Sequence, residues 1–235
     1  MTRRNKRVLV ISDTHAPYQH PDAIRFLAAI KKEYSPDRVI HIGDEIDYHA
    51  MSFHDSDPDL YSASDELRAA VRVIADIQDL YPKVDVIESN HGSLAYRKAK
   101  THGFPRALLR PYKEVLGTPG WNWHFDLTIT LSNGQPCYFH HGKAANILNL
   151  SQAMGMCAVQ GHYHERFNIQ YWGNPLALNW GLQVGCLIDK DSLAFEYGRS
   201  NLKRPVIGCG IILEGQPRLL PLVMGKNGRW NKKLP

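Results

Sequence analysis

Five short clusters rich in aspartate, histidine and asparagine are spread between residues 13 and 164. They are Asp13-Thr14-His15, Gly43-Asp44-Glu45-Ile46-Asp47, Asn90-His91-Gly92, His140-His141-Gly142 and Gly161-His162-Tyr163-His164. Any one of them would more often be an ordinary loop than a site. Together they combine oxygen and imidazole ligands, a mixture that suits manganese, iron or zinc better than magnesium or calcium. The set therefore predicts a transition-metal site.

Each cluster follows a short apolar segment, which indicates how the chain would bring the clusters together. In the first half, β-branched runs at 7–12, 38–42 and 84–88 alternate with segments whose apolar residues recur at helical spacing. One helix is expected to begin at Pro21, and a second to follow a capping box formed by Ser62 and Asp65. This is a βαβαβ pattern, and the carboxyl ends of its strands are where such sheets form sites.

The second half has a different pattern, with short strands separated by turns. Strands are expected at 127–131, 136–140, 157–160, 167–172, 182–187, 206–213 and 218–223, with Asn133-Gly134 as a hairpin turn between the first two. An αβ half followed by a strand-rich half predicts an α/β fold of four layers, a sandwich of two mixed sheets flanked by helices.

The composition fits a single domain over residues 1–235, with 43% hydrophobic and 22% charged residues. No apolar run approaches the roughly 20 residues of a spanning helix, so no membrane contact is expected. The basic start is followed by too short an apolar stretch for a signal peptide. The four cysteines contain no CxxC pair and are expected to be buried and reduced. We therefore expect a cytoplasmic protein, and the sequence does not indicate its oligomeric state.

The net charge of +5 comes mostly from the two ends of the chain. Residues 1–7 carry four positive charges, residues 225–235 carry four more, and neither stretch contains an acid. Removing these eight charges from +5 leaves a body of −3. The basic ends at 1–6 and 225–235 could be flexible, and the charge alone does not indicate a nucleic-acid partner.

The order Asp-x-His, Gly-Asp-x-x-Asp, Asn-His, His-Gly and Gly-His-x-His resembles that of the calcineurin-like metallophosphoesterases. The resemblance covers residues 13 to 164 and implies a centre of two divalent metals, of which manganese is favoured and iron or zinc are alternatives. It implies that the first metal is held by Asp13, His15, Asp44 and His164. It implies that the second is held by Asp44, Asn90, His141 and His162, with Asp44 as the bridge.

The resemblance also implies that His91 protonates the leaving group and that Asp47 orients His91. The chain would then be a metal-dependent hydrolase of phosphate esters. Two cations about 3.5–4 Å apart can lower the pKa of a bridging water, polarise phosphoryl oxygens and clamp an in-line displacement. That physical chemistry agrees with the implied roles.

Two positions depart from the family motif, which has glycine before Asn-His and an acid after it. Here Ser89 and Gly92 occupy those positions. Ser89 could nearly match the close packing of glycine, whereas Gly92 removes an acidic partner for the ligands. We therefore expect the two departures to slow the reaction without abolishing it.

Several histidines and one acidic loop need separate consideration. Adjacent strand residues point to opposite faces, so only one of His140 and His141 can reach the metal, and His141 is preferred. The histidines outside every cluster are read as surface or packing residues: His49, His54, His102 and His124. The stretch 55–59 resembles a calcium loop, but leucine stands where glycine is required, so an ordinary acidic loop is expected.

The expected substrate is a phosphodiester, in nucleic acid or nucleotides. Tyr48 and Glu88 stand where protein serine/threonine phosphatases carry phosphate-binding arginines, and Asp47 stands where repair-type nucleases usually carry histidine. Between His91 and Glu114 the chain is basic and aromatic, without an acid. It could bind a phosphate backbone through Arg97, Arg106 and Arg110, or be a solvated helix followed by a proline-punctuated loop. Alternatives are a phosphomonoesterase, a protein phosphatase and a non-catalytic metal-binding module.

Overall fold

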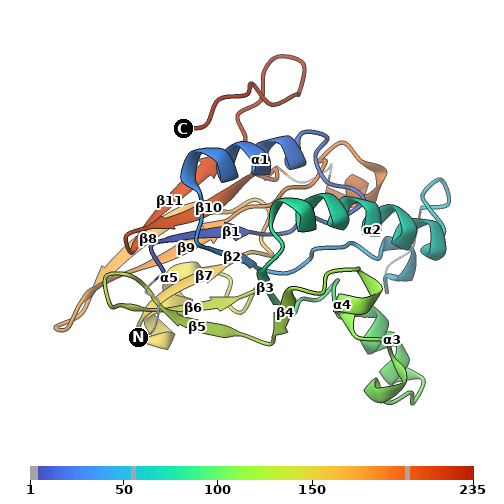
Figure 1. Cartoon of the computed structure of the whole chain (residues 1–235), viewed down its shortest axis with the longest axis horizontal. Coiled ribbons are helices and arrows are strands. Elements are labelled where there is room, and N and C mark those ends of the chain that lie inside the picture. Colours follow the sequence, from blue (N-terminus) through green and yellow to red (C-terminus); the bar gives the residue numbers. More distant parts are fainter. Residues whose placement is uncertain (1–4, 54–56, 199–201) are drawn as a thin grey trace.

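The computed structural model describes residues 5–53, 57–198 and 202–235, and these residues form two β-sheets packed face to face. Helices cover the outer side of each sheet, which gives the four layers (Figure 1). The predicted α/β sandwich of two mixed sheets flanked by helices is therefore confirmed.

The first sheet has the strand order β11-β10-β1-β2-β3-β4 among the described residues. Its strands β1 to β4 run parallel. At one edge β10 is antiparallel to β1, and β11 is antiparallel to β10. The bounds are β1 Arg7–Ile11, β2 Arg38–His41, β3 Val84–Ile87, β4 Trp121–His124, β10 Gly208–Leu213 and β11 Gln216–Pro221.

The second sheet has the order β5-β6-β7-β9-β8. Its three central strands are parallel, and each edge strand is antiparallel to its neighbour. The bounds are β5 Leu127–Thr130, β6 Pro136–His140, β7 Cys157–Gln160, β8 Phe167–Gly173 and β9 Leu178–Val184. The predicted Asn133-Gly134 hairpin is confirmed between β5 and β6, where Gly134 takes a positive φ of 89°.

Strand β1 shows why the core divides into layers. Val8 and Val10 face the core between the two sheets, whereas Leu9 and Ile11 face the helices, and all four are fully buried. A strand buried on both faces has a continuous apolar sequence, as β1 does. It can therefore hold the residues that follow it rigidly at its carboxyl end.

The helices are α1 Ala23–Tyr34, α2 Ala63–Leu80, α3 Leu94–Thr101, α4 Tyr112–Val115 and α5 Ile147–Met154. Short 3₁₀ turns occur at His49–Met51, Arg106–Leu108 and Leu193–Gly198. The Ser62 side chain accepts a hydrogen bond from the Asp65 amide, as the capping box predicts, whereas α1 begins two residues after Pro21. Among the described residues, no helix combines the length and hydropathy that crossing a membrane requires.

The C-terminal segment is attached to the start of α1. The Arg229 guanidinium donates two hydrogen bonds to Asp22, at 2.6 and 2.7 Å, and the Trp230 ring packs against Phe26. The bonds from Arg229 hold the pKa of Asp22 well below its usual range. The basic residues of this end are therefore partly engaged with the domain, while residues 1–4 lie outside the described part of the chain.

Replacing Asp22 with asparagine is expected to lower the free energy of unfolding at pH 7 by about 1 kcal/mol, since Arg229 is half exposed and solvent screens the pair. A depressed carboxyl pKa contributes stability above the unfolded value near 3.9 and loses it as the pH falls toward the folded value. The difference from wild type should therefore shrink in urea unfolding at pH 3. Asp79→Asn, at an exposed position, is the control, and an equal loss in both variants would contradict the assignment.

Candidate metal centre

The five clusters meet at one edge of the two sheets. Strands β1, β2 and β3 run parallel in the first sheet, and β6 and β7 run parallel in the second. Each cluster begins at or just beyond the last residue of its strand. Hydrogen bonds join the two sheets here, such as that between His141 Nδ1 and the carbonyl of Ile42 at 2.8 Å. The strands therefore bring together residues that are up to 151 positions apart in the chain.

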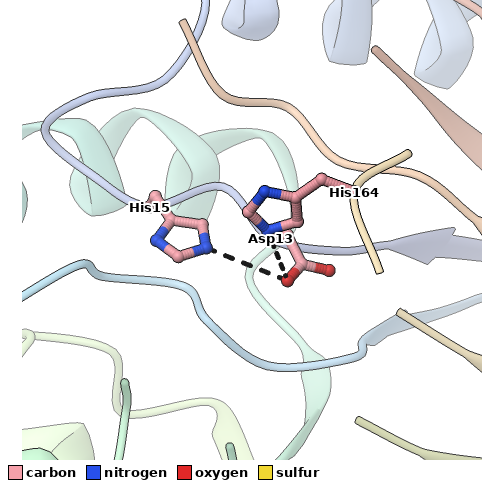
Figure 2. Close-up of side chains that lie close together, drawn as sticks. All are labelled: Asp13, His15 and His164. Atoms are coloured by element: carbon pink, nitrogen blue, oxygen red, sulfur yellow. Dashed lines mark hydrogen bonds and ion pairs between the residues drawn. The ribbon is translucent and has the colours of Figure 1, made fainter. Parts of the chain in front are cut away.

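The first group consists of Asp13, His15 and His164. Figure 2 shows the two imidazoles reaching the same carboxylate oxygen of Asp13 from separate segments of the chain. His164 Nε2 lies 3.2 Å from Asp13 Oδ1, and His15 Nε2 lies 3.8 Å from the same atom. His15 Nε2 is also 3.6 Å from Asp44 Oδ2, which connects this group to the second.

The second group is centred on His141 Nε2. This atom lies 2.7 Å from Asn90 Oδ1, 3.2 Å from Asp44 Oδ2 and 3.2 Å from His162 Nδ1. In each group the ligand atoms of the acids and histidines lie within 4.8 Å of one another. Asp44 Oδ2 approaches a histidine of both groups, as a bridging ligand would.

The donor set fits a cation better than it fits an empty hydrogen-bonded cluster. His15 Nε2 is buried without a hydrogen-bond partner, although it faces two carboxylates at distances too long for a hydrogen bond. A buried polar atom without a partner is costly, so each such atom calls for an explanation. A metal ion bound by Asp13, His15 and Asp44 together would supply that explanation.

The charge balance of the cluster also favours a bound cation. Burial would raise the pKa of Asp13, but interactions with the imidazoles of His15 and His164 outweigh it and hold that pKa well below its usual range. Burial would lower the pKa of His141, but the Asp44 carboxylate raises it to about 9. Ionised acids thus hold protons on neighbouring histidines. Metal binding would displace these protons, because a ligating imidazole must be neutral.

Four of the seven ligand positions have a left-handed backbone, which non-glycine residues rarely adopt. The φ angles are 49° at Asp13, 48° at His15, 50° at Asp44 and 68° at His162. Such conformations cost on the order of 1–3 kcal/mol each and concentrate at functional sites. Here they turn the chain sharply at the strand ends, so that both the acid and the histidine of a cluster point inward.

Asp47 lies between His15 and His91. One of its carboxylate oxygens forms a short hydrogen bond with His15 Nδ1 and lies 3.4 Å from His91 Nδ1. His91 Nδ1 also donates to the backbone carbonyl of Asp47, which fixes the tautomer because a carbonyl can only accept. His91 therefore presents Nε2 away from Asp47, and Asp47 orients a candidate ligand as well as the candidate acid.

The structure shows how the two motif departures are accommodated. The Ser89 hydroxyl accepts hydrogen bonds from the amides of Asp44 (2.8 Å) and Gly92 (3.1 Å), so it connects two of the loops. A Cβ atom at Gly92 would lie only 3.1 Å from Glu45 Oε1. The carboxyl group of Glu45 thus occupies the space beside Gly92, and burial raises its pKa to about 7.

The neighbouring histidines differ in position. His140 lies away from the cluster, stacked on Tyr138 with ring centroids 6.2 Å apart, whereas His141 contacts three candidate ligands.

The histidines outside the five clusters lie in different places. His124 donates to Asp85 at 2.8 Å on β3 and β4, and His102 ends α3. His49 Nδ1 lies 3.7 Å from Asp47, so it is closer to the centre than the sequence indicated. His54 and residues 55–56 of the calcium-loop-like stretch lie outside the described residues.

The basic segment forms α3 followed by a proline-punctuated stretch, and two of its three candidate arginines have protein partners. Arg97 donates to the carbonyl of Asn90 at 3.1 Å, and Arg106 pairs with Glu88 at 2.9 Å. Arg110 is exposed. The pairing of Glu88 with Arg106 offsets the negative charge that the sequence placed near the centre.

Two residues beside the centre were not predicted from the sequence. His41 is fully buried at the end of β2, where its Nε2 bonds the Thr14 hydroxyl at 2.8 Å and burial lowers its pKa to about 4. A histidine in an otherwise apolar strand was the available signal. The Phe195 ring covers His15 and His164, with centroids 5.4 and 6.3 Å away, and no sequence pattern connected it to them.

Residues 6–183 match the family of calcineurin-like phosphoesterases. The chain belongs to this family. The family implies metal-dependent hydrolysis of phosphoesters and generally binds two divalent metals, and the acid and histidine groups of this chain could hold such ions. The resemblance noted from the five motifs is therefore confirmed.

Similar proteins align with nearly the whole of this chain. The Gene 54 proteins of Mycobacterium phages D29 and L5 are each 24% identical, over 94% of this chain and 96% of theirs. Vacuolar Protein Sorting 29 from Cryptosporidium parvum matches with a TM-score of 0.51 at 14% identity, over 95% of both chains. Vps29 from Chaetomium thermophilum matches with a TM-score of 0.50 at 11% identity, over 99% of this chain and 96% of that one. At these identities the two structures show a shared fold alone.

Proposed function

We propose that the protein is a phosphodiesterase with two metals, acting on nucleic acid or nucleotides. The observation that carries this proposal is the position of Asp44 Oδ2, within 3.6 Å of His15 Nε2 and 3.2 Å of His141 Nε2, between two groups of ligands. Two divalent cations, manganese in this proposal, would supply an activated water and stabilise charge on the phosphoryl oxygens. The seven ligands are Asp13, His15, Asp44, Asn90, His141, His162 and His164.

The remaining chemistry belongs to the chain's own residues. The backbone amide of His91 donates to Asp44 Oδ1 at 3.0 Å, and its Nδ1 donates to the carbonyl of Asp47. With the ring held through Nδ1, a protonated His91 can donate a proton from Nε2 to the leaving oxygen. Buried, unpaired cysteines support a reducing compartment such as the cytoplasm.

A diester is favoured over a monoester because of the charge near the centre. Tyr48 is buried, and Glu88 is an acid paired with Arg106, so neither position offers a cation to a terminal phosphate dianion. A diester carries a single negative charge and needs less compensation. Arg97 and Arg110, on or near α3, could contact a phosphate backbone extending from the centre.

Hydrolysis of bis(p-nitrophenyl) phosphate and p-nitrophenyl phosphate by manganese-loaded protein tests this proposal. We expect the diester to have the higher kcat/KM, and we expect chelator-treated protein to be inactive until manganese is returned. Faster hydrolysis of the monoester would refute the diester assignment. Failure to hydrolyse either ester would favour a non-catalytic metal-binding module.

A further inference from the structure

A polar cavity of about 230 Å³ lies on the second sheet, next to the loops that carry the candidate ligands. We call it the amide pocket, because four of its lining residues are carboxamides and two are cations: Asn146, Asn168, Gln170, Gln183, Arg166 and Lys203. None of the described residues that line it is acidic. No step of the proposed hydrolysis uses these residues.

Lining residues of the amide pocket lie close in the chain, or are hydrogen-bonded, to the loops of the metal centre. Asn146 lies in the chain five residues after His141, and Arg166 lies two residues after His164. Gln183 Nε2 donates to the carbonyl of Gly161 at 2.6 Å, and Gly161 directly precedes His162. The pocket is therefore next to the His141 and His162 side of the centre.

The carboxamides gather on the outer face of the second sheet because of strand alternation. Leu182 and Val184 of β9 face the core between the sheets, so Gln183 faces the α5 side. Asn168 of β8 is the cross-strand partner of Gln183. It therefore presents its side chain on the same face.

Part of the pocket is held rigidly by hydrogen bonds. Gln183 Oε1 accepts from Gln160 Nε2 at 2.9 Å, and Asn146 Oδ1 accepts from the Leu148 amide at 2.8 Å. Asn168 differs, because its Oδ1 is buried without a hydrogen-bond partner. A ligand that brings a donor to this acceptor would be favoured over one that leaves it unpaired.

The lining selects a ligand that is both anionic and rich in hydrogen-bonding groups. Arg166 and Lys203 suit a phosphate group, and the Arg166 guanidinium lies 4.7 Å over the Tyr163 ring with its Nε 3.4 Å from Glu165. Carboxamides pair with the donor and acceptor edges of nucleobases. A volume below the roughly 300 Å³ of drug-sized sites suits one small unit and not a polymer.

We propose that the amide pocket binds one nucleotide unit of the substrate, beside the phosphodiester that is cleaved at the metal centre. Arg166 and Lys203 hold the phosphate of this unit, and Asn168 with Gln170 accepts and donates hydrogen bonds at the edge of its base. This inference rests on the proposed function, because it names the part of the diester substrate that lies next to the cleaved bond.

Equilibrium binding to chelator-treated protein, measured by calorimetry, tests the pocket without catalysis. The probes are adenosine 5′-monophosphate, ribose 5-phosphate and inorganic phosphate. We expect the nucleotide to bind about tenfold more tightly than ribose 5-phosphate, which corresponds to one good hydrogen-bonding contact. Asn168→Leu should remove that difference, Lys203→Glu should weaken both phosphorylated sugars, and Lys83→Glu, at an exposed position before β3, should change neither.

Equal binding of the nucleotide and inorganic phosphate would overturn the proposal, as would an unchanged nucleotide affinity in Asn168→Leu. Thermal unfolding of each variant shows whether the fold is kept, and Gln170→Ala provides a milder change in the same pocket. Hydrolysis of bis(p-nitrophenyl) phosphate, which has no base, should be equal in wild type and Lys83→Glu. If wild type fails to hydrolyse this ester, the proposed function is wrong. The nucleotide-binding measurement would still show whether the amide pocket binds a nucleotide.

Discussion

Asp44→Asn is expected to lose both metals together and to lose activity more completely than any other ligand variant. Asp44 Oδ2 lies between His15 and His141, and its Oδ1 accepts the His91 amide, so one carboxylate supports both groups and the candidate acid. Removing even an outer partner of a metal ligand typically costs about 10–100-fold in affinity. A shared ligand should cost more, because its negative charge interacts with two cations.

Metal content after manganese loading and gel filtration is the measurement for Asp44→Asn. Wild type should retain about two ions per chain, and the variant fewer than one. Asn90→Ala is the matched comparison. The Asn90 side chain contacts only the His141 group, so this variant should lose one ion and keep the other. Asp126→Asn, which changes an acid bonded to Tyr138 outside the centre, is the control. Full metal retention in Asp44→Asn would refute the bridging assignment.

His91→Ala is expected to reduce turnover of alkyl phosphodiesters by about 10²–10⁴-fold while metal content stays at the wild-type level. An alkoxide leaving group needs a proton in the transition state, and His91 Nε2 is the group that the Asp47 carbonyl leaves available. A p-nitrophenolate leaving group hardly needs this proton, so the loss on p-nitrophenyl esters should be much smaller. An equal loss on both classes of ester would make His91 a substrate-binding residue instead.

The position of Asp47 makes its variant a second test. Asp47→Asn should slow alkyl esters, but it should also weaken metal binding, because Asp47 bonds His15 Nδ1 and orients that candidate ligand. The double variant should be little worse than the more damaged single variant if His91 and Asp47 act as a unit. Metal content that falls in Asp47→Asn but not in His91→Ala is the expected signature of a shared orienting carboxylate.

Much of the centre could be predicted from the sequence because its residues follow buried strands directly. Parallel strands end at the same edge, so a list of strand ends is nearly a list of neighbours. The same reasoning could not find the bond between Asp47 and His15. That contact depends on the path of the loop after β2, where Tyr48 adopts a positive φ of 55°, and no spacing rule describes that path.

The outer elements were harder to predict than the strand ends. Strand β4 was missed because its Trp121-Asn122-Trp123-His124 sequence alternates over only four residues. Helix α5 was also missed, although Asn146 caps its start and Gly155 ends it in a left-handed conformation. Strand β9 begins at Leu178, four residues before the predicted start, because Gly181 interrupts the apolar pattern where it packs against Ile147.

The contact between Glu45 and Gly92 makes the two positions dependent on each other in evolution. A side chain added at position 92 would meet Ser89 Oγ at 2.9 Å and Glu45 Oε1 at 3.1 Å. Ser89 cannot move freely, because its hydroxyl also holds the Asp44 amide. A side chain gained at position 92 would therefore require both Ser89 Oγ and the Glu45 carboxyl to shift. An acid introduced at position 92 alone would also place a second carboxyl group beside that of Glu45, so the effect of a change at either position depends on the residue at the other.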